Sequence, residues 1–241
     1  MLLFVIGGIQ KTTLLDFPEK VAAIVFTQGC NFRCGYCHNP ELLSYPPFEG
    51  ESKFLTSGRG KSEKDFLSFL KTRIGKLDGV VITGGEPTLQ SGLYDFVKEI
   101  KSLGFAVKLD TNGTNPNILE RLLKDDLLDY IAMDIKAPFE KYCEITGVNI
   151  DIKKIKKSIE LIINSSVDYE FRTTVLKSQL SIEDFDKIGK MMKGAKKYYL
   201  QKFIASKIYN TNLKNAEVYT DEELHSICDT LSNYISFVNY R

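Results

Sequence analysis

Three cysteines near the start of the chain have the spacing of cluster ligands. Cys30, Cys34 and Cys37 lie in the run Gln28-Gly-Cys-Asn-Phe-Arg-Cys-Gly-Tyr-Cys-His-Asn-Pro40. Thiolates spaced Cys-x3-Cys-x2-Cys can bind three corners of a 4Fe-4S cube. This run contains neither a fourth cysteine nor an acidic residue, so the fourth iron would be vacant or held by a ligand. A reaction can start at such an open iron.

A zinc site with His38 as fourth ligand is the alternative for the same residues. Cys37 and His38 are adjacent, which makes an awkward tetrahedral pair, and structural zinc sites usually combine two separated halves. The sequence shows no second half, so we favour the cluster. The remaining cysteines, Cys143 and Cys228, stand alone among a total of 5. This odd number predicts metal binding in a reducing cytoplasm rather than a disulfide framework.

The composition is that of a globular chain with balanced charge. With 241 residues and 43% hydrophobic content, it can bury a sizeable core. We expect a single domain over residues 1–241, with an irregular insertion at 43–61. The 32 basic and 31 acidic side chains leave a net charge of +1. This balance gives no general reason to expect nucleic acid or an anionic membrane as a partner.

The apolar start of the chain is predicted to be a strand. Residues 1–9 lack the basic leader of a signal peptide. They also fall far short of the ~20 residues that span a bilayer. We therefore expect no membrane segment here.

After the cysteines, short β-branched runs alternate with longer stretches of helical periodicity. This alternation is typical of a parallel sheet covered by helices. Six strands are predicted after the N-terminal one, at 22–27, 79–83, 106–110, 130–134, 169–175 and 198–204. Helices are predicted at 62–74, 92–102, 116–124, 152–164, 181–192 and 220–232.

Unusual residues directly follow four of the predicted strands. They are the segments 30–37, 84–87, 110–115 and 134–138. The carboxyl ends of parallel strands converge on one face, whether the sheet is open or closed into a barrel, and ligands bind there. We therefore expect the four segments to form a common site.

The cysteine spacing, with an aromatic residue at Tyr36, resembles the signature of the radical S-adenosylmethionine (SAM) superfamily. The resemblance implies that SAM chelates the open iron of a single 4Fe-4S cluster. It also implies reductive cleavage of SAM to a 5′-deoxyadenosyl radical that abstracts a hydrogen atom. The implied fold is a partial, parallel (β/α)6 barrel of the TIM type, open on one side. A chain of this length suits such a barrel better than a closed eightfold one, which usually takes ~250 residues.

The segment Thr83-Gly-Gly-Glu-Pro87 matches a second motif of that superfamily. The resemblance implies that Gly84, Gly85, Glu86 and Pro87 bind the amino group of SAM. Glycines let backbone carbonyls approach an ammonium closely, and a carboxylate adds charge. Taken alone, the same residues are more often just an ordinary turn after a strand. Together with the cysteine motif about fifty residues upstream, they favour the SAM site.

Two further segments, Leu109-Asp-Thr-Asn-Gly113 and Met133-Asp-Ile-Lys-Ala137, are similar to segments of glycyl-radical-enzyme activating enzymes. That resemblance places Asp110 and Lys136 near the methionine carboxylate of SAM. It also implies a small monovalent cation bound by oxygens of Asp110, Thr111 and Asp134. The residues themselves equally allow a helix N-cap at Asp110 and a surface ion pair at Lys136.

Arg172 matches an arginine that contacts SAM in the same group of enzymes. A charge within a strand needs a partner, so a buried salt bridge is an equal alternative. Gln201 occupies one of the alternate positions in the strand predicted at 198–204 whose side chains would face the mouth of the barrel. The implied cofactor-binding set is completed by Tyr36, His38, Asn39 and Asn112. No catalytic side chain is assigned beyond the cluster and the SAM site.

The resemblance is strongest to the activating proteins of anaerobic ribonucleotide reductases and covers nearly the whole chain. It is carried by Gln10–Pro18, Phe26–Cys30 and Cys37–Glu41. It implies an anaerobic oxidoreductase that takes a hydrogen atom from a glycine of a partner glycyl radical enzyme. A flavodoxin-like or ferredoxin-like protein is the implied electron donor. The alternatives are a radical SAM enzyme acting on a small molecule or a peptide, and a zinc-binding module without catalysis.

Overall fold

A computed structural model describes residues 4–44 and 62–241. Within them, eight strands form one sheet in chain order. The first strand, β1, is antiparallel to β2, and all later neighbours are parallel. The strands are β1 (Ile6–Thr13), β2 (Ala22–Thr27), β3 (Gly79–Gly84), β4 (Ala106–Thr111), β5 (Tyr130–Asp134), β6 (Asp168–Val175), β7 (Lys197–Lys202) and β8 (Phe237–Tyr240). Since β1 and β8 are the two ends of this order, the described sheet is open.

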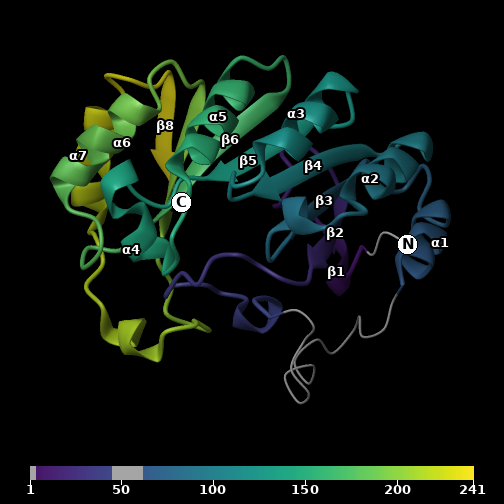
Figure 1. Ribbon diagram of the computed structural model, residues 1–241, viewed down its shortest axis with the longest axis horizontal. Helices are drawn as coiled ribbons and strands as arrows, with labels where there is room; N and C mark the ends of the chain where they lie inside the picture. Colours follow the sequence, from purple (N-terminus) through teal and green to yellow (C-terminus); the bar gives the residue numbers. More distant parts are fainter. Residues whose placement is uncertain (1–3, 45–61) are drawn as a thin grey trace.

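Helices connect the successive parallel strands and lie along one face of the sheet (Figure 1). Each crossover moves one strand along the sheet, which is the arrangement of the predicted partial (β/α)6 barrel. The connecting helices are α1 (Glu63–Lys71), α2 (Leu93–Ser102), α3 (Pro116–Lys124), α5 (Ile152–Ile163), α6 (Ile182–Met191) and α7 (Asp221–Leu231). Shorter helical segments are η1 (Pro40–Leu42), η3 (Pro87–Leu89), η4 (Phe139–Lys141), α4 (Tyr142–Thr146) and η5 (Thr211–Asn215).

Three elements differ from the sequence prediction. The first strand runs over Ile6–Thr13 rather than 1–9, and it is antiparallel. The C-terminal aromatic residues form an additional strand, β8, whose half-exposed edge position leaves it without a clear buried face. The short helix α4 was not predicted, because five residues are too few to show helical periodicity. Of the predicted insertion at 43–61, residues 45–61 lie outside the described residues.

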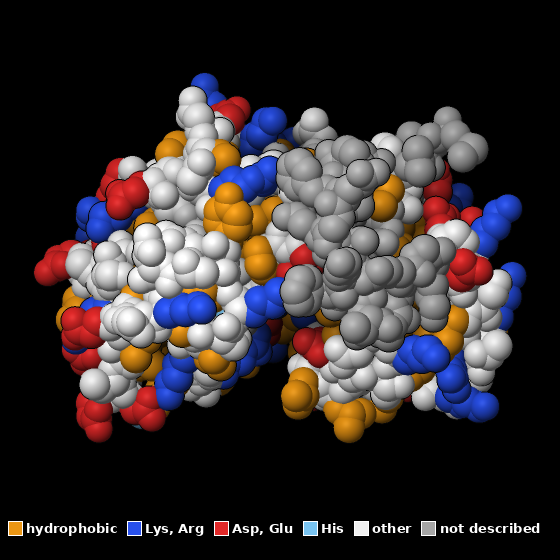
Figure 2. All heavy atoms as spheres, turned by 90° about the horizontal axis from the view of Figure 1, so that it is seen from below, with side chains coloured by type: hydrophobic (Ala, Val, Ile, Leu, Met, Phe, Trp, Pro, Cys, Tyr) orange, Lys and Arg blue, Asp and Glu red, His pale blue; other side chains and the backbone are white. Residues whose placement is uncertain are grey.

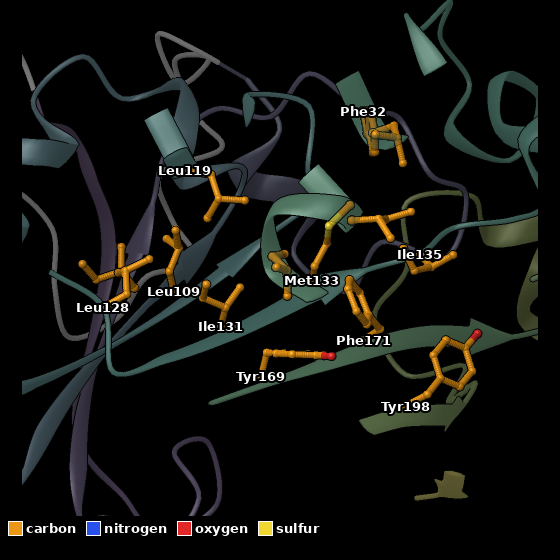
Figure 3. Close-up of a cluster of buried hydrophobic side chains, with 14 of the residues drawn as sticks. Phe32, Leu109, Leu119, Leu128, Ile131, Met133, Ile135, Tyr169, Phe171 and Tyr198 are labelled. Atoms are coloured by element: carbon orange, nitrogen blue, oxygen red, sulfur yellow. The ribbon is translucent and has the colours of Figure 1, made fainter. Parts of the chain in front are cut away.

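Alternation along the strands separates two faces of the sheet. Leu109, Ile131 and Phe171 point toward the helices and belong to the main hydrophobic core, where α3 supplies Leu119 (Figure 3). Residues one position away point to the face opposite the helices. On that face a small apolar cluster consists of Phe17, Ala22, Ile24, Val81 and Tyr130. Further along the same strands, this face becomes polar.

The loop after β2 and the segment after β7 lie at one end of the molecule, the end that Figure 2 faces. Lys and Arg side chains are interspersed there with Asp and Glu (Figure 2). Every helix in residues 4–44 and 62–241 is too short or too polar to cross a membrane.

Phe17 anchors the small apolar cluster, whereas its neighbour Leu15 is exposed. Phe17 is 2% exposed and Leu15 is 93% exposed. We expect Phe17→Ala to lower the free energy of unfolding by about 3–5 kcal/mol, because it leaves a cavity against Tyr130. Leu15→Ala, the matched control, should change it by less than about 0.5 kcal/mol. Urea denaturation of both variants measures the difference, and equal losses would contradict the assignment of this cluster as a second core.

Candidate functional site

Residues at the carboxyl ends of six strands, β2 to β7, or in the loops that follow them, line one pocket. All of the residues predicted for the cluster and SAM sites line it, except Pro87. Pro87 is buried at the start of η3. The pocket is lined by Cys30, Phe32, Cys34, Tyr36, Cys37, His38, Asn39, Leu43, Thr83, Gly84, Gly85, Glu86, Asp110, Thr111, Asn112, Asp134, Lys136, Arg172, Thr174 and Gln201. The structure therefore brings the four predicted segments together.

Backbone hydrogen bonds fasten the cysteine loop at both of its ends. The Cys30 N–H donates to the Leu43 carbonyl (3.3 Å), and the Tyr209 N–H donates to the Cys37 carbonyl (3.0 Å). Inside the loop, the Phe32 N–H donates to the Cys30 Sγ (3.4 Å). Side chains that ligate a cluster need a fixed backbone of this kind. N–H groups that donate to their sulfurs tune the reduction potential of the cluster.

Burial governs the chemistry of these thiols. It raises the pKa of Cys30 to about 12 and also raises the pKa values of Cys34 and Cys37. The thiols are therefore protonated at neutral pH in the metal-free protein. Metal binding would hold them as thiolates and release their protons.

The donor set fits a cluster better than a single ion. Among the described residues, no three Cys, His, Asp or Glu side chains are grouped as ligands of one metal ion. In a 4Fe-4S cube each thiolate binds a different iron, so the sulfurs need not converge on one point. Tyr36 also lines this pocket, and its buried hydroxyl has no hydrogen-bond partner among the described residues. Such an orphaned polar atom is consistent with a missing bound group.

The glycine pair after β3 allows two loops to touch backbone to backbone. A Cβ on Gly85 would lie 2.0 Å from the Gly29 carbonyl oxygen, and one on Gly84 would lie 2.3 Å from Thr27 N. Gly84 also has φ of +116°, a conformation that L side chains rarely adopt. The Glu86 N–H donates to the Gly29 carbonyl at 2.8 Å. These glycines thus allow the segment 84–87 to pack directly against the cysteine loop. The sequence of the motif did not indicate this close approach of the two backbones.

The Glu86 carboxylate is 1% exposed and already fully engaged. Its Oε1 accepts from the Thr88 N–H (3.0 Å), the Thr88 hydroxyl (2.5 Å) and the Thr111 hydroxyl (2.7 Å). Its Oε2 accepts from the Asn112 N–H (2.6 Å). Burial raises the pKa of this carboxyl, and the hydrogen bonds oppose that rise. Glu86 therefore ties the loops after β3 and β4 together, and it also lines the pocket.

Alternating charges cross the polar face of the sheet from β4 to β6. Arg172 Nε lies 2.9 Å from Asp134 Oδ1, and its NH1 lies 3.3 Å from Asp110 Oδ2. Lys108 pairs with Asp110 at 2.8 Å, and Lys136 pairs with Asp134 at 3.0 Å. Arg172 NH1 also lies 4.0 Å from Glu170 Oε1, which pairs with Arg241 at 2.6 Å. Four cationic side chains therefore face three carboxylates, which leaves one positive charge in this network. Arg172 thus forms the buried salt bridge that the sequence allowed, while still lining the pocket.

The network shifts the ionisation of its members. Burial raises the pKa of Asp134, but Arg172 and Lys136 outweigh it and hold that pKa below its ordinary value. Burial lowers the pKa of Lys136, but the Asp134 carboxylate outweighs it and raises that pKa well above its ordinary value. Asp134 and Lys136 are therefore both charged at neutral pH.

Sequence reasoning missed three polar residues that support the site. Lys108 is two positions before Asp110 in a strand, so period-two alternation alone could have placed both on one face. Asn31 and Tyr142 carried no comparable signal. The Tyr142 hydroxyl accepts from the Lys136 N–H at 3.2 Å. Asn31 bonds to side chains more than 80 positions away in the chain.

Comparison with known proteins places this geometry in a family. The model of the radical SAM superfamily matches residues 24–192. A protein of Methanocaldococcus jannaschii, provisionally named a glycyl-radical enzyme activating enzyme, is 33% identical over 98% of this chain and 95% of its own length. The chain belongs to the radical SAM superfamily. It is accordingly an enzyme of the oxidoreductase type, and membership implies a 4Fe-4S cluster and SAM as cofactors.

Two further relatives with named activities match about two thirds of this radical SAM chain or less. The pyruvate formate-lyase-activating enzyme of Clostridium pasteurianum is 32% identical over 59% of this chain and 57% of its own. The 7-carboxy-7-deazaguanine synthase of Aquifex aeolicus is 32% identical over 68% of this chain and 64% of its own. The crystal structure of QueE from Escherichia coli superposes with a TM-score of 0.55 at 17% identity. It covers 99% of this chain and 93% of QueE, and it supports the partial-barrel fold.

The contact between the two loops predicts the cost of adding a methyl group. We expect Gly85→Ala to lower the free energy of unfolding by about 1–3 kcal/mol, because its Cβ would overlap backbone that cannot move independently. Gly35→Ala is the matched control in the cysteine loop, because its Cβ would meet no backbone there: its nearest neighbours would be the end of the Leu213 side chain at 3.0 Å and the Asn210 Cβ at 3.4 Å. It should cost less than about 1 kcal/mol. Chemical denaturation compares the two variants, and an equal effect would argue against backbone packing at Gly85.

Removing the central cation of the network should strongly destabilise the protein. We expect Arg172→Met to cost about 3–5 kcal/mol at pH 7, because it leaves Asp110 and Asp134 short of a partner. The pKa of Asp134 is lowered in the folded state. The stabilisation is therefore complete above the unfolded-state pKa of about 3.9 and is lost as the pH falls further.

Urea denaturation between pH 7 and pH 3 should show the difference between wild type and Arg172→Met shrinking in acid. Lys157→Ala is the control, because its ion pair with Glu120 is exposed. It should cost less than about 1 kcal/mol at every pH. A difference for Arg172→Met that does not change with pH would contradict the electrostatic explanation.

Proposed function

We propose that this enzyme generates a glycyl radical on a partner protein. In this proposal Cys30, Cys34 and Cys37 hold a single 4Fe-4S cluster whose fourth iron binds SAM. When the cluster and SAM are bound, the reduced cluster would supply one electron to the SAM sulfonium, and a carbon–sulfur bond of SAM would break. The products would be methionine and a 5′-deoxyadenosyl radical, and this radical would take a hydrogen atom from a glycine Cα. The supporting observation is that the thiols share one pocket with the glycine loop and the ion network.

The walls of the pocket differ in charge, and this difference supports an orientation for SAM. The ion network on this wall has one excess positive charge when Glu170 and its partner Arg241 are counted. Its other members are Lys108, Lys136, Arg172, Asp110 and Asp134. A carboxylate is favoured beside such a network. We therefore assign the methionine carboxylate to the side of Lys136 and Arg172, and the amino group to the backbone carbonyls of the glycine loop.

The chain's own cations take the place of a monovalent cation in this proposal. Asp110 and Asp134 already pair with Lys108, Lys136 and Arg172. The Thr111 hydroxyl is directed to Glu86 rather than toward the two aspartates. The resemblance that implied a cation site at these residues therefore has little support from their contacts.

Similarity along almost the whole chain favours a protein substrate. The relative from Methanocaldococcus jannaschii matches 98% of this chain, and its name states the activation of a glycyl radical enzyme. A small-molecule substrate is the second candidate, favoured by the similarity to 7-carboxy-7-deazaguanine synthase over 68% of the chain. In either case we expect a flavodoxin-like or ferredoxin-like protein to supply the electron.

Anaerobic reconstitution tests the reaction. Protein loaded with iron and sulfide, reduced with dithionite and mixed with SAM should release 5′-deoxyadenosine and methionine. The Cys34→Ala variant should release neither, because it lacks one cluster ligand. Stoichiometric zinc in protein purified without oxygen, with no iron or sulfide, would instead support the zinc site.

The target is tested separately. Addition of a glycyl radical enzyme encoded in the same genome should give the doublet of a glycyl radical in the electron paramagnetic resonance spectrum. Turnover of a small molecule without any protein partner would support the second candidate and contradict the first.

A further inference from the structure

Asn31, the residue after Cys30, connects the cysteine loop to the loop after β4. Its Nδ2 donates to the Thr114 hydroxyl oxygen at 2.9 Å, and its Oδ1 accepts from Asn112 Nδ2 at 2.8 Å. Both polar atoms of the amide are therefore used, which fixes its orientation.

Asn112 continues this connection to the glycine loop. Its backbone N–H donates to Glu86 Oε2 at 2.6 Å, and its Oδ1 accepts from the Thr114 N–H (3.0 Å) and hydroxyl (2.7 Å). A continuous chain of hydrogen bonds thus runs from Asn31 through Asn112 to Glu86. It spans the loops after β2, β3 and β4.

The connection is shielded from water over most of its length. Asn112 is 6% exposed, Thr114 is 7% exposed and Glu86 is 1% exposed. Hydrogen bonds between buried groups are costly to leave unmade, because each freed donor or acceptor stays desolvated. Truncation of Asn31 would free the Asn112 amide donor and the Thr114 oxygen together. The loops after β2 and β4 would then lose their side-chain connection, while the contact of Gly85 with Gly29 would remain.

We propose that Asn31 is a positioning residue that aligns the cysteine loop with the loops that bind SAM. This inference rests on the proposed function. Asn31 does not itself line the pocket, so it acts through Cys30 on one side and through Asn112 on the other. Cluster binding requires only the three thiols. Chelation of SAM also requires that the open iron lie at the correct position relative to the loops after β3 and β4. The loss of Asn31 therefore weakens SAM binding and leaves cluster loading intact.

The test uses reconstituted full-length protein and measures four quantities. These are the iron and sulfide content, the Kd of SAM by equilibrium dialysis, the change that SAM causes in the paramagnetic resonance spectrum of the reduced cluster, and the free energy of unfolding. For Asn31→Ala we expect unchanged iron and sulfide, a Kd raised by about tenfold or more, and a diminished spectral change with SAM. A tenfold change corresponds to about 1.4 kcal/mol, near the value of one or two net hydrogen bonds.

Two further variants sharpen the test. Asn31→Asp keeps the acceptor for Asn112 but loses the donor to Thr114, so its Kd should lie between those of wild type and Asn31→Ala. Asn115→Ala is the matched control, because the Asn115 Nδ2 donates at 2.7 Å to the Thr88 carbonyl and makes no described side-chain bond to the cysteine loop. Its Kd should stay within about threefold of wild type, even if its stability falls.

Wild-type affinity in Asn31→Ala would overturn the proposal. So would equal losses in Asn31→Ala and Asn115→Ala, since they would show a general effect of stability. A fall in iron content in parallel with SAM binding would assign Asn31 to cluster loading instead. If the wild type loaded with iron and sulfide neither binds SAM nor releases 5′-deoxyadenosine, the proposed function itself fails. If the wild type does both but forms no glycyl radical, only the target is wrong, and the role of Asn31 is still tested.

Discussion

The close approach of Gly85 to the Gly29 carbonyl is the constraint on which the rest of the site depends. A Cβ at position 85 would lie 2.0 Å from that oxygen, a distance that no side chain tolerates. The Glu86 N–H then donates to the same carbonyl. Two loops from neighbouring strands are thereby held as one unit. The three thiols on the first loop consequently face a pocket whose next wall is the second loop.

Two different physical solutions compensate the buried carboxylates in this pocket. Glu86 is surrounded by neutral hydrogen-bond donors, and burial raises its pKa. Asp134 is paired with Arg172 and Lys136, and its pKa is lowered. Removing one donor from Glu86 leaves its other neutral donors in place, but removing Arg172 leaves uncompensated charge. The second change is expected to be the more costly, because an unpaired buried ion is more expensive than an unmade neutral hydrogen bond.

Much of the fold could be predicted because its strands are buried and strongly periodic. All six strands expected after the first are present, with Asp110 and Asp134 at or next to their carboxyl ends. The additional strand β8 and the short helix α4 were missed, because a half-exposed edge strand and a helix of little more than one turn carry weak patterns. The predicted site residues line one pocket, apart from Pro87. Their individual contacts were less predictable, since Glu86 lines the pocket and also connects two loops, which its motif did not indicate.

By itself, the sequence determined the kind of chemistry and the end of the sheet at which it occurs. Cysteine spacing is a local property, and the convergence of parallel strand ends follows from hydrophobic periodicity. Only the tertiary structure decided which polar groups meet. Asn31 and Asn112 are 81 positions apart, and Asp110 and Arg172 are 62 positions apart. Side-chain hydrogen bonds act over about 3 Å, so such pairs depend on the register of neighbouring strands and on the course of their loops, which no local pattern encodes.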